Sequence, residues 1–213
     1  MSKIGCLLLA MALLAMPIQK TPGVTDNQQK VFELDSGLHK KAADRFARIT
    51  AKKNGVPAEN GRIGSGVIIE TNKVLTCYHV IMVDHDMYVN GFLVEKYTVD
   101  PANDLALLTV PTKPISTVQY ATSIQVGEKI FSIGATTETP EFPCVGMIQI
   151  IEPDADKIWY DIHGIYGRSG GGVYDYAGNL VAINMETKRS DMGCPISIGR
   201  SVIGIRKFLK SHG

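Results

Sequence analysis

The amino-acid sequence predicts an all-β fold that is closed or nearly closed and ends in a short helix. Short apolar runs of strand length recur along most of the chain, and turn residues separate them. Glycine, with 21 residues, is used somewhat above average, which favours a turn-rich β architecture. Near the C-terminus, the apolar residues instead follow helical spacing. Regular strands followed by one terminal helix are typical of barrel-like folds.

The elements are expected in a simple order along the chain. Ser36 is placed to cap a short helix that runs through Ala43. The strand Ile63–Glu70 follows, and the Thr71-Asn72 turn joins it to its hairpin partner, Lys73–Val80. Further strands are expected at 87–97, 105–110, 129–133, 145–151, 158–162, 172–174, 180–184 and 195–198. The last element is a helix over 201–210, whose apolar face consists of Val202, Ile205 and Leu209.

The N-terminus is predicted to lie outside the folded domain. Residues Ile4–Met16 are apolar and uncharged, follow Lys3, and are fewer than the ~18–20 that a membrane-spanning helix needs. This pattern is typical of a secretory signal peptide. We therefore assign 1–20 as a signal peptide or an uncleaved signal-anchor, 21–44 as a linker with a short helix, and 45–213 as the folded domain. An exported protein is expected, whether periplasmic, secreted or membrane-anchored, with the membrane contacted only through the N-terminal segment.

Composition excludes several classes of function. Lys and Arg total 22 and Asp and Glu 21, so the chain lacks the basic field of a general nucleic-acid binder. A hydrophobic content of 45% excludes a disordered chain. Of the four cysteines, Cys77, Cys144 and Cys194 lie beyond the N-terminal segment, and the sequence does not choose among their possible pairings. No Cys-x-x-Cys pair indicates structural zinc, and we expect neither a metal nor a cofactor.

Three segments carry residues suited to nucleophilic catalysis. VLTCYHVI places His79 at the end of a strand, DPANDLALLTV places Asp104 before an apolar strand, and GRSGGGV places Ser169 in a glycine-rich turn. A serine hydroxyl needs a neighbouring base, and imidazole suits that task because its ordinary pKa lies near neutrality. A carboxylate behind the imidazole fixes its tautomer and stabilises the imidazolium. The backbone amides of Gly167 and Ser169 are candidates for the oxyanion hole.

The order and spacing of these segments identify a family resemblance. The order His–Asp–Ser differs from that of α/β-hydrolases and of subtilisins. Seven segments of the chain are similar to those of trypsin/chymotrypsin-fold serine endopeptidases. They are GSGVII (64–69), LTCYHV (75–80), DLALL (104–108), FSIG (131–134), VGMI (145–148), GRSGGGV (167–173) and GNLVAIN (178–184). The resemblance is greatest to compact bacterial HtrA-like peptidases, covers about Ala47–Leu209, and includes no PDZ domain.

This resemblance implies a fold and roles for individual residues. It implies two six-stranded antiparallel β-barrels, with the active site in the cleft between them and a boundary near 111–125. It implies that His79 is the general base, Asp104 its orienting acid and Ser169 the nucleophile. By the same resemblance, Asn184, Met185 and Glu186 pair with the substrate backbone, and His163 lies at the base of the primary specificity pocket.

Some residues depart from the family pattern or compete with it. Arg168 precedes the nucleophile where zymogen-activated trypsins carry Asp, so activation by a new N-terminus is not expected. Arg168 could pair with a carboxylate such as Asp161, lie exposed, or disorder the loop. His163 in place of an acid argues against a preference for basic residues, although it could instead be turned away from the pocket. Asp100 competes with Asp104 for the acid role, but Asp100-Pro101 is typical of a turn.

The sequence therefore predicts a serine endopeptidase that acts on a protein or peptide substrate through an acyl-enzyme. One alternative is a pseudoprotease, in which the same fold only binds peptides or has a structural role. Another is an acyl transferase or esterase, because the acyl-enzyme chemistry would be shared.

Overall fold

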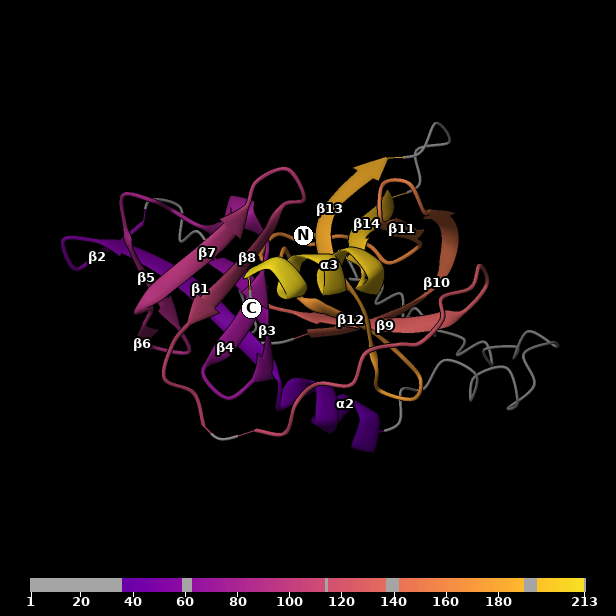
Figure 1. Cartoon of the computed structure of the whole chain (residues 1–213), viewed down its shortest axis with the longest axis horizontal. Helices are drawn as coiled ribbons and strands as arrows, with labels where there is room; N and C mark the ends of the chain where they lie inside the picture. The colour runs from indigo at the N-terminus through magenta and orange to yellow at the C-terminus, as the bar shows by residue number, and fades with distance from the viewer. Residues whose placement is uncertain (1–35, 59–62, 114, 137–141, 190–194, 213) are drawn as a thin grey trace, which may run out of the picture. The chain divides into compact units, whose positions relative to one another are not determined.

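The structure is a computed structural model that describes residues 36–58, 63–113, 115–136, 142–189 and 195–212 (Figure 1). The predicted signal segment 1–20, most of the linker and Cys194 lie outside these ranges. Within them, no helix is long and apolar enough to cross a membrane. The first described element is the helix α2 (Ser36–Ala43).

The N-terminal half of the domain is a single eight-stranded sheet. Its strands follow the order β6-β5-β1-β3-β4-β8-β7, with β2 paired to β1, and all the pairs are antiparallel. Their bounds are β1 (Phe46–Lys53), β2 (Val56–Pro57), β3 (Ile63–Glu70), β4 (Lys73–Thr76), β5 (Asp86–Val89), β6 (Phe92–Leu93), β7 (Lys96–Asp100) and β8 (Leu105–Thr109).

The C-terminal half is a closed six-stranded barrel with the order β10-β11-β14-β13-β12-β9. Its strands are β9 (Lys129–Gly134), β10 (Phe142–Glu152), β11 (Lys157–Tyr160), β12 (Gly172–Asp175), β13 (Leu180–Arg189) and β14 (Pro195–Ser201). The helix α3 (Val202–His212) follows β14 directly and packs on β13, β14 and β8. The predicted all-β class and C-terminal helix are therefore confirmed.

The expectation of two closed barrels holds for one half only. In the N-terminal sheet, β6 and β7 are the two ends and are not paired with each other. Only Val94 and Glu95 separate these strands, and their amides bond elsewhere, to Met87 O and Thr109 O. β6 and β7 therefore remain the two ends of the strand order, and the sheet is open.

Several strand predictions need correction. The strand β1 was not expected, although it is central to its sheet and pairs with β2, β3 and β5. The hairpin partner predicted over Lys73–Val80 ends at Thr76, and a 3₁₀ turn (Tyr78–Val80) follows. The strand predicted over 87–97 is interrupted at Asn90-Gly91, where both residues have positive φ. A tight turn at that point separates β5 from β6, and Val94 and Glu95 separate β6 from β7.

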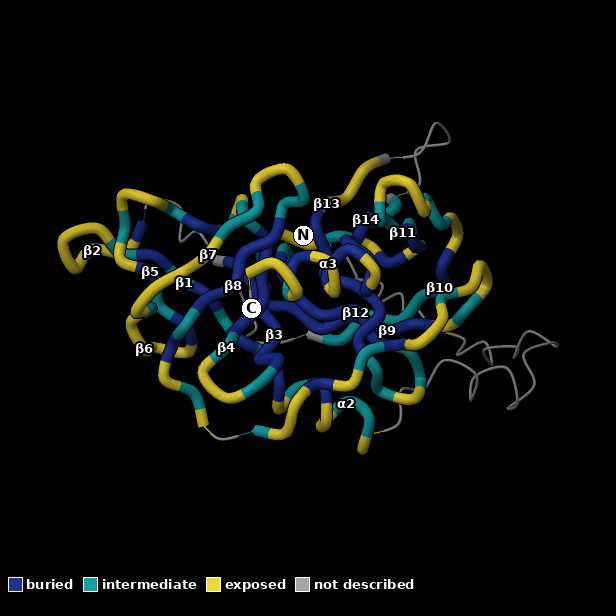
Figure 2. Tube along the Cα trace, viewed as in Figure 1, coloured by how far each residue is buried: buried dark blue, intermediate teal, exposed yellow. Residues whose placement is uncertain are grey.

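Three buried apolar clusters form the core, and one of them joins the two halves. This joining cluster contains Leu75 and Leu105 from the sheet, Phe131 and Ile183 from the barrel, and Phe208 from α3. The other two clusters lie within the sheet and within the barrel, respectively. Figure 2 shows that β8, β9 and β12 are buried over most of their length, whereas β2 and β6 are exposed. The segments that carry His79, Asp104 and Ser169 adjoin strands β4, β8 and β12, which contribute to this joining cluster.

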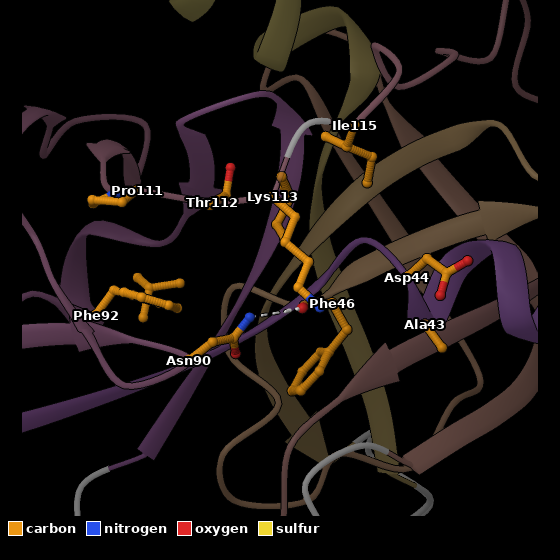
Figure 3. A pocket seen from close by; sticks show the side chains of 11 residues that line it. Ala43, Asp44, Phe46, Asn90, Phe92, Pro111, Thr112, Lys113 and Ile115 are labelled. Atoms are coloured by element: carbon orange, nitrogen blue, oxygen red, sulfur yellow. Dashed lines mark hydrogen bonds between the residues drawn. The ribbon is translucent and has the colours of Figure 1, made fainter.

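A surface hollow of about 620 Å³ lies on the N-terminal half (Figure 3). It is lined by residues from the α2–β1 junction, from β1, β3, β5 and β6, and from the segment after β8. Phe46 and Phe92 contribute aromatic rings, and the Asn90 side chain donates to Phe46 O within it. None of the predicted catalytic or binding residues lines this hollow.

Candidate active site

His79 is held in a turn by the carboxylate of Asp104. The chain leaves β4 at Thr76, passes through Cys77 and enters the 3₁₀ turn that contains His79. The backbone N–H of His79 donates to Asp104 Oδ1 at 3.0 Å, and its Nδ1 lies 2.8 Å from Asp104 Oδ2. Since a carboxylate only accepts, Nδ1 carries the proton and Nε2 is left with its lone pair. The His79 side chain is 46% exposed, so this nitrogen can be reached from outside.

The competition between Asp100 and Asp104 is resolved by their hydrogen bonds. Asp100 accepts from the backbone N–H of Asn103 at 3.2 Å and from its side-chain amide at 2.7 Å. It therefore shapes the turn, as its position before Pro101 predicts. Asp104 adopts a positive φ of 53° at the start of β8, a conformation that Asp tolerates better than most residues. That turn directs its carboxylate to His79.

Ser169 lies in a loop that joins the barrel to the turn of His79. The N–H of Gly170 and the thiol of Cys77 both donate to the carbonyl of Asn184, at 2.8 and 3.3 Å. Cys77 is two residues before His79 and Gly170 is one residue after Ser169, so the two segments meet at this carbonyl. The Ser169 hydroxyl donates to Met185 O at 3.1 Å. Within the described ranges it has no hydrogen bond to His79.

The backbone amides of Gly167 and Ser169 are available for a ligand. Neighbouring amides are all bonded within the loop or to β13: Arg168 N–H to Ile165 O, Gly170 N–H to Asn184 O, and Gly171 N–H to Arg168 O. By contrast, the N–H groups of Gly167 and Ser169 have no hydrogen bond to any other described residue. Two unpaired donors beside a serine hydroxyl form the arrangement that stabilises a developing oxyanion.

Arg168 is neither exposed nor paired with Asp161. Its side chain is 1% exposed and donates to Ser132 O and Ser132 Oγ at 2.8 and 2.9 Å, and to Cys144 Sγ at 3.3 Å. Asp161 instead accepts from the Met147 N–H and the Gln149 side chain. The hypotheses of an exposed Arg168 and of a pair with Asp161 are therefore wrong, because the guanidinium points into the barrel wall.

The predicted substrate-contacting residues are placed differently from one another. Asn184 is 5% exposed, and its N–H and carbonyl are both bonded to the Ser169 loop, at Gly171 and Gly170. Asn184 is therefore not free to pair with a substrate strand. From Glu186 onward, β13 is paired with β14 on one edge, whereas β12 pairs with β13 only up to Ile183. Among the described strands, none pairs with the other edge of β13 near Met185 and Glu186.

His163 is exposed, and the chain beside it packs on β13. A side chain at Gly164 would collide with Thr187, whose hydroxyl lies 3.1 Å from that of Ser197. Ser197 in turn donates to Ile162 O at 2.7 Å. The space between residues 162–164 and β13 is therefore filled by hydroxyl side chains rather than by the imidazole of His163.

Cys77 is a neighbour of the site that sequence reasoning did not single out. It is fully buried, and its Sγ lies within 4.8 Å of ligand atoms of both His79 and Asp104. Burial raises the pKa of this thiol well above its usual value, and the Asp104 charge raises it further. Because only a thiolate binds a metal well, the trio is poorly suited to an ion. Cys77 and Cys144 are both free thiols.

Comparisons with known proteins identify the family. Residues 64–183 match the family model of the trypsin-like peptidase domain, and the chain belongs to this family. The resemblance inferred from the sequence motifs is confirmed. No curated protein matches the sequence significantly.

Solved structures share the fold. The inactive form of the Rv3671c protease aligns with a TM-score of 0.69 and 17% identity over 84% of this chain and 94% of that one. The inactive form of its Ser343Ala mutant, from M. tuberculosis, aligns with a TM-score of 0.68 and 16% identity over 84% of this chain and 91% of that one. The serine endoprotease from Yersinia pestis aligns with a TM-score of 0.70 and 20% identity over 82% of this chain and 64% of that one. At such identities, the likeness establishes the trypsin-like fold alone.

Proposed function

We propose that the chain is a serine endopeptidase in which Ser169, His79 and Asp104 form the catalytic triad. The observation that carries the proposal is the hydrogen-bonded His79–Asp104 pair, joined through Asn184 O to a serine loop with two unpaired amides. Each group has the chemistry its task requires.

The proposed reaction follows from these groups. After rotation of its hydroxyl away from Met185 O, Ser169 Oγ attacks the scissile carbonyl carbon while His79 Nε2 accepts its proton. The carbonyl oxygen becomes an anion that the amides of Gly167 and Ser169 stabilise. His79 then protonates the leaving amine, which breaks the C–N bond and leaves an acyl group on Ser169. Water, deprotonated by His79, attacks this ester. The bond to Ser169 Oγ then breaks, His79 returns the proton to that oxygen, and the acid is released.

The edge of β13 supports a peptide as the substrate. A peptide can add to an unpaired strand edge through main-chain hydrogen bonds that do not depend on its sequence. The edge near Met185 and Glu186 lies next to Ser169, whose hydroxyl already contacts Met185 O at 3.1 Å. We propose that an added strand there presents its scissile bond to Ser169. Glu186 is exposed and within 3.3 Å of Lys188 Nζ, so both charges can meet the substrate.

Labelling with a fluorophosphonate probe tests the proposal on the full chain. The parent and Ser123→Ala, which changes an exposed serine outside the site, should be labelled between about pH 6 and pH 9. Ser169→Ala should not be labelled. A folded parent that remains unlabelled would contradict the proposal and favour the peptide-binding alternative. Digestion of a peptide library by the labelled parent then separates a peptidase from an esterase or acyl transferase.

A further inference from the structure

The loop from Ile165 to Gly171 must hold two amides in place although it contains residues of unusual backbone freedom. Gly167 and Gly170 have positive φ values of 97° and 85°. Glycine adopts such values readily but also leaves them readily. Stabilisation of an oxyanion requires donors that are already in position before the reaction. The loop therefore needs anchors outside itself.

The first anchor is Ser65, a fully buried residue of β3 in the N-terminal sheet. Its hydroxyl donates to Gly167 O at 2.7 Å and accepts from the N–H of Ala135 at 2.8 Å. Its backbone N–H donates to Ser169 O at 2.8 Å. A fourth bond, from the Thr76 hydroxyl to Ser65 O at 2.7 Å, ties Ser65 to β4. One serine thus fixes the carbonyls of both residues whose amides are available.

The second anchor is the side chain of Arg168, between those two residues. It extends from the loop into the barrel, where both Ser132 O and Ser132 Oγ accept from Nη2. The fit is close, because a Cβ on Gly134 would lie 3.0 Å from Arg168 Cα. A guanidinium that is 1% exposed pays a large desolvation cost unless its donors are bonded, so its position is narrowly defined.

We propose that Ser65 and Arg168 are positioning residues that hold the Gly167 and Ser169 amides from opposite sides, one from each half of the domain. This inference rests on the proposed serine peptidase function. Three consecutive residues are then fixed: Gly167 and Ser169 through their carbonyls and Arg168 through its side chain. Neither anchor touches the substrate. Their removal should weaken stabilisation of the transition state while leaving substrate binding largely intact.

Kinetics of the full chain test the inference, with rates expressed per active site titrated by the fluorophosphonate. Arg168→Met and Ser65→Ala should each lower kcat by about 10²-fold, with KM changed less than about threefold. The pH at half-maximal rate should not move, because His79 and Asp104 are untouched. Arg168→Lys, which keeps the charge, should recover part of the rate. The matched controls are Arg206→Met, an exposed arginine of α3, and Ser201→Ala, whose buried hydroxyl has no hydrogen bond.

The outcomes separate this inference from the function on which it rests. If the parent is labelled and Arg168→Met and Ser65→Ala turn over at the parent rate per titrated site, both residues are merely structural and the inference is wrong. If Arg168→Met does not fold, Arg168→Lys and Ser65→Ala decide by the same criterion. A parent that is neither labelled nor active overturns the proposed function, and the inference with it.

Discussion

The two halves of the domain position their functional groups by different means. In the closed barrel, each of the six strands pairs with two neighbours, and the Ser169 loop leads directly into β12. The N-terminal sheet is open, and His79 and Asp104 lie in turns outside its strands. Those turns are fixed by side chains, and part of the support comes from the barrel: Arg200 of β14 donates to Asn103 O at 2.9 Å. The closed half therefore helps to align the turns of the open half, just as Ser65 of the open half supports the Ser169 loop.

The largest effect is expected where the open half supplies chemistry rather than structure. Asp104→Asn keeps the size of the side chain but can present an amide to His79 Nδ1, which favours the wrong tautomer. We expect kcat to fall by about 10⁴-fold with little change in the circular dichroism spectrum. Asp100→Asn, which alters only the turn, is the matched control. Equal losses in the two variants would mean that Asp104 is not the orienting acid.

The contact between the halves can be disrupted at Gly170. A methyl group there would collide with Ser65 O and the Thr76 hydroxyl, and the residue has a φ of +85°. Gly170→Ala should therefore lower the free energy of unfolding by about 4 kcal/mol, since backbone strain and overpacking add. Gly127→Ala has a similar φ of +83° but nothing within 4 Å, and should lose only about 1 kcal/mol. Urea titration measures both values, and similar losses would show that the collision is relieved.

Cavities in the separate cores test whether the halves unfold together. Leu108 lies in the cluster of the sheet and Ile148 in that of the barrel, and both are fully buried. Leu108→Ala and Ile148→Ala should each lower the free energy of unfolding by about 3 kcal/mol. Because a third cluster joins the halves, calorimetry should show one transition, shifted in both variants. A separate early transition in either variant would show that the halves are independent.

Alkaline pH should destabilise the barrel through its buried tyrosines. Burial raises the pKa of Tyr160 and Tyr174 well above the usual value, and raises that of Tyr120 to about 12. Unfolded tyrosine ionises near pH 10, so the stability that these tyrosines contribute is complete below about pH 10 and is lost as pH rises further. Above that pH, each buried tyrosine should lower the free energy of unfolding by up to about 1.4 kcal/mol per pH unit.

The matched variants for this prediction are Tyr174→Phe in the barrel and Tyr97→Phe in the sheet. Tyr174 is 1% exposed, whereas Tyr97 is 40% exposed. Denaturant unfolding between about pH 9 and pH 12 gives the free energy of unfolding at each pH. With rising pH this free energy should fall less steeply in Tyr174→Phe than in the parent, and as steeply as in the parent in Tyr97→Phe. Parallel curves for all three proteins would place the alkaline sensitivity elsewhere.

The smallest effect is expected at a surface pair of the C-terminal half. Lys207 Nζ lies 2.8 Å from Asp156 Oδ2, but its side chain is 67% exposed. Lys207→Ala should lower the free energy of unfolding by about 0.5 kcal/mol at low salt, and by less in about 1 M salt. Lys210→Ala, also on α3, is the control. A loss above about 1.5 kcal/mol that persists in high salt would contradict this view of the pair.

The sequence predicted elements well where the apolar pattern was strong. The strands over 63–70, 105–110 and 129–133 and the C-terminal helix were placed within one or two residues. The strand β1 was missed because its buried positions are Ala47, Ile49 and Ala51. Two of these three residues are alanines, which give a weak apolar signal. Its position in the centre of the sheet, with neighbours on both edges, is what makes it a strand.

For the candidate site too, local features could be predicted from the sequence, whereas contacts between distant segments could not. His79, Asp104 and Ser169 could be named from residue type, order and spacing, because their chemistry is local to each side chain. The roles of Ser65 and Arg168 could not, because a serine in a strand and an arginine before a serine carry no local signal of a partner. Ser65 donates a hydrogen bond to Gly167, which is 102 residues away, and Arg168 donates one to Ser132, which is 36 residues away.

Sequence alone thus determined the class of fold, the family and the residues with suitable chemistry, since periodicity and residue type are properties of short segments. Only the tertiary structure decided that one sheet closes and the other does not, that Asp104 rather than Asp100 meets His79, and that Arg168 is buried. Those outcomes depend on contacts between distant segments. Such contacts form only when the whole chain satisfies its buried polar groups and packs its apolar side chains at the same time.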